Sequence, residues 1–243
     1  MAKFFLFKPI GKTPLEVIND YKKNHTETSI DKICYVYRLD PMACGMFLVL
    51  TNEDCYDTNK YLTKIDKTYK YKLLIGVKTN TLDCLGNIEE INNSKIENIQ
   101  EKLNYFFSVY YTGSIVQTLP KYCGYKIHNK PLWYYANNNI DIDLPERNVH
   151  IYRNTINSIE KIKGTELKAY VNKYLTIIKG NFPTMKYLES WNTLENTREF
   201  TIVNIESKVS SGTFIRKICE DFGNYIHMPC MAFQIERLSI HLV

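Results

Sequence analysis

The sequence predicts a mixed α/β fold of the α+β type, and three observations support this. Residues 69–75 (Tyr-Lys-Tyr-Lys-Leu-Leu-Ile) begin with strict alternation, which is typical of a strand with one side in solvent. Residues 14–23 carry Leu15, Ile18 and Tyr21 at helical spacing. Segments of both kinds are intermixed along the chain, which indicates strands and helices packed in layers.

The individual elements follow from the same patterns. We expect strands over residues 4–7, 33–37, 46–50, 69–75 and 200–209, where apolar or alternating runs occur. We expect helices over residues 14–23, 53–63, 92–107 and 214–225. The third of these helices has Ser94 with Glu97 three residues later, a capping-box pattern that predicts its start.

Composition limits the classes of function. The 243 residues are 44% hydrophobic, enough for a sizeable core, and the net charge of +5 is compatible with a polyanionic partner. Nineteen tyrosines would suit stacking on unpaired bases, although some must belong to the core. Seven cysteines without a C-x-x-C pair argue against a metal site or a disulfide framework and favour a reducing, cytoplasmic setting. The apolar run at residues 4–7 is too short to span a membrane.

Residues 37–50 contain the strongest candidate for chemistry. Asp40 precedes Pro41, then Gly45 and an apolar run, so its carboxylate is expected on a rigid loop packed against a buried strand. An Asp-Pro pair is also a common turn initiator, and this loop alone favours the turn interpretation.

The chain resembles the TruB family of pseudouridine synthases, and four segments in the family's order carry the resemblance. They are residues 8–13 (Lys-Pro-Ile-Gly-Lys-Thr), 39–45 (Leu-Asp-Pro-Met-Ala-Cys-Gly), 67–86 (Lys-Thr-Tyr, then the Gly, Thr, Thr, Asp and Gly positions) and 212–223 (Gly-Thr-Phe-Ile-Arg to Asp-Phe-Gly), with Arg237-Leu238 beyond. Residues 120–136 fit the family's RNA-gripping thumb more loosely. The chain departs from the family at Tyr35, which occupies a histidine position, and at Phe214, which occupies a tyrosine position.

The resemblance implies the pseudouridine synthase fold, with a bent, mostly antiparallel mixed sheet flanked by helices. It implies one catalytic domain over residues 1–243, with a thumb-like segment at about 117–146. We interpret residues 154–198 as an insertion that is partly ordered and surface-exposed; its lysines could contact RNA or be solvated. We expect no C-terminal RNA-binding tail domain after Val243.

The resemblance also assigns roles to side chains. Asp40 would be the catalytic carboxylate, acting either as a nucleophile or as a base in an elimination route. A cationic neighbour would favour its ionised form, and Arg216 is our candidate, although a surface arginine is the alternative. Tyr69 would place its ring against the uracil and could relay a proton.

Further substrate contacts are expected around a flipped base. The resemblance places Tyr35, Phe214 and Ile235 at this base. Lys8, Lys12 and Lys126 are candidate phosphate contacts, and each could equally be an ordinary surface lysine.

The function implied is isomerisation of uridine to pseudouridine, at position 55 in the T-arm of transfer RNA. The reaction changes no oxidation state and needs no energy input, so we expect no cofactor and no metal. We expect a monomer. The alternatives are a synthase acting on other RNA, a tRNA folding chaperone with little catalysis, and an unrelated α/β protein.

Overall fold

The computed structural model describes residues 3–25, 30–62, 65–92 and 94–242. The strands are β1 (Lys3–Lys8), β2 (Ile33–Val36), β3 (Ala43–Thr51), β4 (Ile65–Ile75), β5 (Val77–Thr79), β6 (Ile88–Ile91), β7 (Gly113–Thr118), β8 (Lys126–Ile127), β9 (Lys130–Pro131), β10 (Glu146–Lys163), β11 (Glu199–Ser210) and β12 (Cys230–Leu242). The helices are α1 (Pro14–Asn24), α2 (Asn59–Leu62), α3 (Ile99–Val109), α4 (Leu132–Asn137), α5 (Gly164–Leu175), α6 (Thr184–Asn192) and α7 (Ile215–Ile226), with a 3-10 helix η1 (Asn52–Tyr56). All five predicted strands are present.

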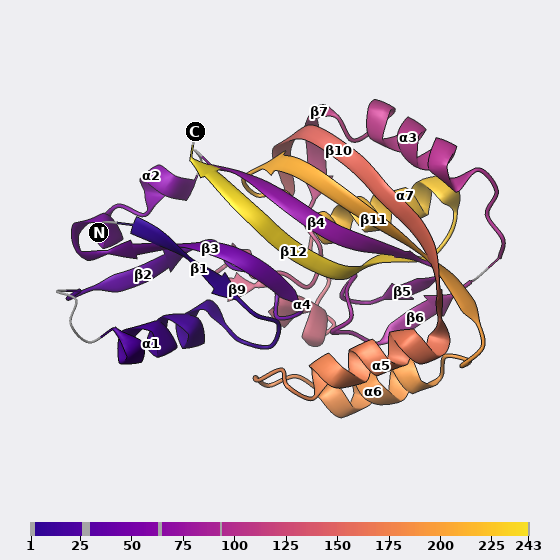
Figure 1. Cartoon of the computed structure of the whole chain (residues 1–243), viewed down its shortest axis with the longest axis horizontal. Helices are drawn as coiled ribbons and strands as arrows, with labels where there is room; N and C mark the ends of the chain where they lie inside the picture. Colours follow the sequence, from indigo (N-terminus) through magenta and orange to yellow (C-terminus); the bar gives the residue numbers. More distant parts are fainter. Residues whose placement is uncertain (1–2, 26–29, 63–64, 93, 243) are drawn as a thin grey trace.

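One large sheet organises the molecule (Figure 1). Its strand order is β1-β3-β12-β4-β11-β10-β7, and β2 also pairs with β3. Neighbours are antiparallel except β12 and β3, which run parallel from Ile235 opposite Ala43 to Arg237 opposite Gly45. The predicted mixed α/β class with a mostly antiparallel sheet is therefore confirmed. The parallel pair matters for function because it joins the last strand to the loop that carries Asp40.

Helices cover both faces of the sheet (Figure 1). On one face α3 and α7 pack against β4 and β11, with Phe106 and Phe222 among the buried residues. On the other face α5 and α6 pack through Val171 and Trp191, both 0% exposed. The expected surface-exposed, partly ordered character of residues 154–198 is therefore wrong: the segment supplies the end of β10 and two core-forming helices.

Strand β1 buries one side of a continuous apolar run. In β1, Phe4, Leu6 and Lys8 share the inward side, whereas Phe5 and Phe7 are 41% and 49% exposed. Helix α1 begins with a complete capping box between Thr13 and Glu16.

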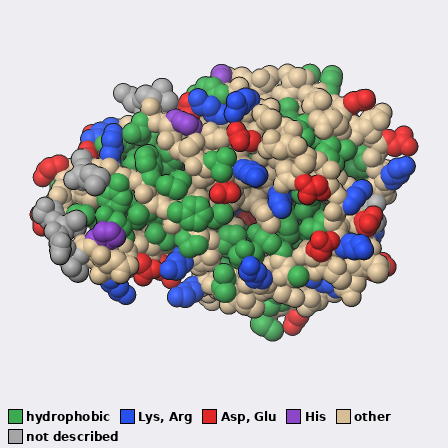
Figure 2. Space-filling view, in the orientation of Figure 1, with side chains coloured by type: hydrophobic (Ala, Val, Ile, Leu, Met, Phe, Trp, Pro, Cys, Tyr) green, Lys and Arg blue, Asp and Glu red, His purple; other side chains and the backbone are tan. Residues whose placement is uncertain are grey.

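Hydrophobic side chains gather over this end of the molecule in Figure 2, and lysines and arginines are scattered around them rather than gathered in one patch. Charge density on this face therefore does not mark a site.

Two helix predictions differ from the structure. Helix α3 begins at Ile99 after a left-handed Asn98, and Ser94 donates its hydroxyl to Asn92 instead of capping a helix. Ile96 packs against the core before the helix starts, so tertiary contact overrides the local pattern. The predicted helix at residues 53–63 is split into η1 and α2, and its last residue, Thr63, lies outside the described residues. No helix in the described part of the chain is long and apolar enough to cross a membrane.

Candidate active site

A cleft of about 940 Å³ lies where the Asp40 loop meets β4, β12 and the turn between β11 and α7. Six of the predicted site residues line it: Asp40, Tyr69, Lys126, Phe214, Arg216 and Ile235. Lys8 and Tyr35 do not line it. Six of the residues expected at the site thus share one cleft, whereas Lys8 and Tyr35 lie elsewhere.

The Asp40 loop is held from both sides by hydrogen bonds. The Ala43 N–H donates to the Asp40 carbonyl at 3.0 Å, closing a turn around Pro41. Lys8 Nζ donates to the carbonyls of Ala43 at 2.6 Å and Pro41 at 3.3 Å. The loop is thus anchored to β1, and this fixes the backbone from which the Asp40 carboxylate extends.

Lys8 is therefore a structural residue, and its expected role as a phosphate contact is wrong. It is 1% exposed and points along the inward side of β1 into the Asp40 loop. Burial lowers the pKa of Lys8 to about 8, while the charge of Asp40 opposes this shift. An amine enclosed in this way cannot reach a phosphate outside the cleft.

Gly45 fixes the position of the loop against the last strand. Its φ is +124°, and a Cβ there would lie 2.3 Å from the Arg237 carbonyl oxygen. Only glycine permits both this backbone conformation and this approach. The parallel contact of β3 with β12 therefore depends on Gly45. Asp40 lies in the loop that leads into this part of β3.

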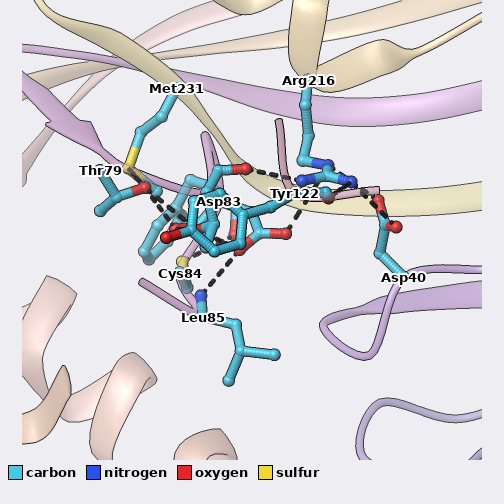
Figure 3. Close-up of polar contacts among 10 residues, drawn as sticks. Asp40, Thr79, Asp83, Cys84, Leu85, Tyr122, Arg216 and Met231 are labelled. Carbon is cyan, nitrogen blue, oxygen red and sulfur yellow. Dashed lines mark hydrogen bonds and ion pairs between the residues drawn. The ribbon is translucent and has the colours of Figure 1, made fainter. Parts of the chain in front are cut away.

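Arg216 reaches Asp40 from helix α7, 176 residues further along the chain. Its Nη2 donates to Asp40 Oδ1 at 3.1 Å, and its Nε lies 2.9 Å from Oδ2. The same guanidinium donates to the carbonyls of Thr81 at 2.6 Å and Tyr122 at 3.0 Å (Figure 3). The Arg216 side chain is 3% exposed and that of Asp40 is 36% exposed. The guanidinium is thus fixed from behind while the carboxylate faces the cleft.

Asp83 is a second carboxylate behind the guanidinium, and the sequence analysis gave it no role. Its Oδ2 lies 3.7 Å from Arg216 Nε, and its Oδ1 accepts from Thr81 Oγ1 and the Leu85 N–H, both at 2.9 Å. Burial lowers the pKa of Arg216, but the charges of Asp40 and Asp83 outweigh burial and raise it. Burial likewise raises the pKa of Asp83, against the attraction of Arg216. The conformation of the 79–86 loop thus positions Arg216.

The walls of the cleft are mainly apolar around Asp40. Tyr69 on β4 and Ile235 on β12 are each 8% exposed and belong to the core on the α7 face. Phe214 precedes α7, and its backbone N–H donates to Gln117 Oε1 at 3.0 Å. Lys126 on β8 is exposed at the rim. Together these residues form an apolar wall beside the Asp40 carboxylate, with Lys126 at the rim.

Tyr35 does not line the cleft that holds Asp40, so the structure gives no support to its expected place beside a flipped base. It pairs with Val49 in the sheet, and its ring meets Phe47 edge-on at 6.3 Å. Tyr37, two residues later, lines the cleft instead and donates its hydroxyl to the Tyr61 carbonyl. Strand β2 ends at Val36, and Tyr37 follows it with a positive φ, so neighbouring tyrosines of this segment lie in different surroundings.

Four basic residues in the cleft were also unassigned: Arg38, Lys67, Arg147 and Arg237. Two of them lie in segments that the sequence analysis quoted, Lys67 before Tyr69 and Arg237 before Leu238. For Lys67 and Arg237, the available signal was a basic residue on a largely buried strand. Lys67 is 4% exposed and Arg237 is 1% exposed.

Comparison with solved structures identifies the fold. A chain of a Cbf5-Nop10-Gar1 complex matches with a TM-score of 0.56 at 15% identity, covering 98% of this chain and 48% of that chain. A chain of an H/ACA RNP bound to a substrate RNA containing 2'-deoxyuridine gives 0.52 at 15% identity, covering 97% and 46%. At this identity the likeness concerns the fold alone, which is the pseudouridine synthase fold.

Sequence comparison gives the family. A model described as TruB family pseudouridylate synthase (N terminal domain) matches residues 23–177, and this chain belongs to the TruB family. The tRNA pseudouridine synthase B of Wigglesworthia glossinidia brevipalpis is 34% identical over 238 residues, covering 97% of this chain and 58% of that protein. That of Syntrophus aciditrophicus (strain SB) is 31% identical over 156 residues, covering 63% and 47%. The chain spans only about half the length of such relatives.

Proposed function

We propose that this protein is an RNA pseudouridine synthase that isomerises uridine 55 in the T-arm of transfer RNA. The observation that carries the proposal is the contact of both Asp40 carboxylate oxygens with Arg216 at the end of the cleft. Membership of the TruB family and relatives named tRNA pseudouridine synthase B support the substrate class. They also favour a cytoplasmic enzyme, and we propose that it acts as a monomer.

Asp40 is the proposed catalytic residue. As a nucleophile, its carboxylate oxygen forms a bond to C1′ of the ribose while the bond between N1 and C1′ breaks and the uracil leaves as its anion; the bond between the carboxylate and C1′ breaks again when C5 attacks C1′. As a base in an elimination route, it takes a ribose proton and later returns it. In either route the uracil turns, C5 bonds to C1′, and the proton on C5 is lost to solvent as N1 gains one. Atoms and oxidation state balance within the nucleotide.

The other cleft residues would orient the reactants. Arg216 keeps both carboxylate oxygens in place, which makes the approach to the sugar reproducible. Tyr69, Phe214 and Ile235 would enclose the uracil after it leaves the RNA stack. Phe214 has no hydroxyl, so Tyr69 is the proposed proton relay beside the base.

Binding of the RNA would extend from the rim of this cleft. We propose that residues 117–146 form a thumb that grips the RNA, with Lys126 contacting a phosphate. Exposed aromatic rings support this role, because Tyr125 is 42% and Trp133 is 47% exposed in the same segment. Lys12 has a carboxylate partner, Asp20, at 2.7 Å, which makes it a weaker candidate.

Pseudouridine mapping tests the proposal. A tRNA transcript is incubated with the pure protein, and a transcript with cytidine at position 55 is the control. We expect pseudouridine at position 55 of the first transcript and none in the control. Tight binding of the tRNA without any pseudouridine would overturn the proposal and favour a tRNA folding chaperone. Modification only at other positions would show a synthase with a different target.

A further inference from the structure

Three of the basic side chains that line the cleft lie close together. Lys67 on β4, Arg147 on β10 and Arg237 on β12 all line this region. The Lys67 amine lies 3.4 Å from Ser211 Oγ and 3.5 Å from the centre of the Tyr37 ring. Arg237 is fixed behind it, with its Nε donating to the Met46 carbonyl at 2.6 Å. Arg147 is exposed at the rim and packs beside Gly212.

This cluster has no balancing carboxylate. Within the described ranges, no ion pair shorter than 4.0 Å involves Lys67, Arg147 or Arg237. In the same described part of the chain, Nη2 of Arg237 is buried and has no hydrogen-bond partner. Lys67 and Arg237 are buried, whereas Arg147 is exposed. Buried polar groups normally have partners, so these three basic side chains without a carboxylate partner indicate a site for an anion.

The electrostatics of Lys67 agree with this geometry. Burial, together with the charges of Arg237 and Arg147, lowers the pKa of Lys67 to about 6. Asp66, its neighbour on β4, opposes the shift and is outweighed. The remaining groups near the amine, Ser211 and the Tyr37 ring, carry no charge. An anion beside Lys67 would relieve this repulsion.

We propose that Lys67 and Arg147, backed by the buried guanidinium of Arg237, bind one backbone phosphate of the RNA. The proposed phosphate site lies in the same cleft as Asp40, so it would hold the RNA backbone beside the nucleotide that reacts. The identity of the anion as an RNA phosphate rests on the proposed function. A phosphodiester suits the site because it offers acceptor oxygens to both side chains and keeps one negative charge near neutral pH.

The test neutralises one phosphate at a time. Affinities are measured for a T-arm hairpin and for copies in which single phosphates are replaced by uncharged methylphosphonates. The proteins are the wild type, Lys67→Met, Arg147→Met and the control Lys70→Met, which removes a lysine from the opposite face of the same strand. Circular dichroism checks that each protein is folded, and Arg147, being exposed, keeps the test available if Lys67→Met unfolds.

We expect one position at which methylphosphonate weakens wild-type binding about tenfold. Lys67→Met and Arg147→Met should bind the unmodified hairpin about tenfold more weakly than the wild type does. In these two variants, methylphosphonate at that position should cause little further loss of affinity. Lys70→Met should behave as wild type. If the loss of affinity from the side-chain substitution and the loss from methylphosphonate multiply at every phosphate position, the proposed phosphate site is overturned. If that happens while the wild type forms pseudouridine, the proposed function stands. If coupling is found without turnover, the phosphate site stands and the proposed function fails.

Discussion

Replacing Arg216 by lysine separates positioning of the Asp40 carboxylate from the mere presence of a positive charge. The guanidinium makes two contacts to Asp40 and two hydrogen bonds to the carbonyls of Thr81 and Tyr122. A lysine ammonium is a single point charge and cannot reproduce this planar set of donors. The expected consequences are a misdirected carboxylate and at least one buried carbonyl without a donor.

The magnitudes follow from those lost contacts. We expect single-turnover isomerisation at saturating enzyme to fall at least about tenfold, which corresponds to about 1.4 kcal/mol of barrier. The unpaired carbonyl should lower the free energy of unfolding by about 1–3 kcal/mol, measured by urea denaturation. RNA affinity should change little, because Arg216 is 2% exposed and turned away from the rim.

A matched control uses the same substitution at the surface. Arg153→Lys alters an arginine that is 63% exposed and pairs with Glu206 at 3.0 Å. This change should leave both turnover and stability within experimental error, because exposed ion pairs contribute little. If Arg216→Lys also kept a near-wild-type rate, the proposed positioning of Asp40 by Arg216 would be refuted.

Three further predictions concern the support of the cleft and its charge. Gly45→Ala should destabilise the fold by at least about 2 kcal/mol, because the added Cβ would meet the β12 backbone. Gly113→Ala, also at positive φ but with open space around the added Cβ, should destabilise the fold less. Thermal and urea unfolding measure both variants. Lys8→Met should lower stability by about 2 kcal/mol without changing the salt dependence of RNA binding, whereas Lys126→Met should flatten that dependence. RNA affinity should fall as pH rises above about 6, because a bound phosphate raises the pKa of Lys67 and the complex then holds a proton that the free protein lacks. Lys67→Met should remove this pH dependence, and an unchanged pH dependence in that variant would contradict the prediction.

The five strands that the sequence predicted are present because their patterns match burial along the chain, whereas the long strands β10 and β12 were not among the predicted ranges. Residues 69–75 alternate, and the structure places Tyr69, Tyr71 and Leu73 in one core while Lys70 faces the other way. The errors in the helices came from positions where tertiary packing decides. Ile96 packs into the core ahead of α3, which no local capping pattern encodes.

Residues 154–198 show a different kind of error, since the necessary signal was present. Leu167, Val171 and Leu175 recur at four-residue spacing, as do Tyr187 and Trp191, and these are the buried faces of α5 and α6. The many Lys and Asn residues between them obscured that period. Hydrophobic periodicity was a better guide than average polarity here.

For the site, the sequence supplied motifs but not distances. The contact between Asp40 and Arg216 joins residues 176 positions apart and was expected only through the family resemblance. Lys8 was misjudged although it continues the inward side of β1 after Phe4 and Leu6, so strand phase already favoured burial. Asp83 has no pattern of its own that distinguishes it from a loop carboxylate.

Tritium release from C5-labelled uridine in a T-arm hairpin tests the central claim most directly. The measurement compares wild type with Asp40→Asn, which keeps the size of the side chain and removes its charge, and determines hairpin affinity in parallel. We expect the wild type to release tritium in proportion to pseudouridine formed. Asp40→Asn should release none above background while binding the hairpin within a few-fold of wild type, because phosphate contacts supply most of the affinity. Turnover by Asp40→Asn within about tenfold of the wild-type rate, a barrier change below about 1.4 kcal/mol, would contradict the assignment of Asp40 as the catalytic residue.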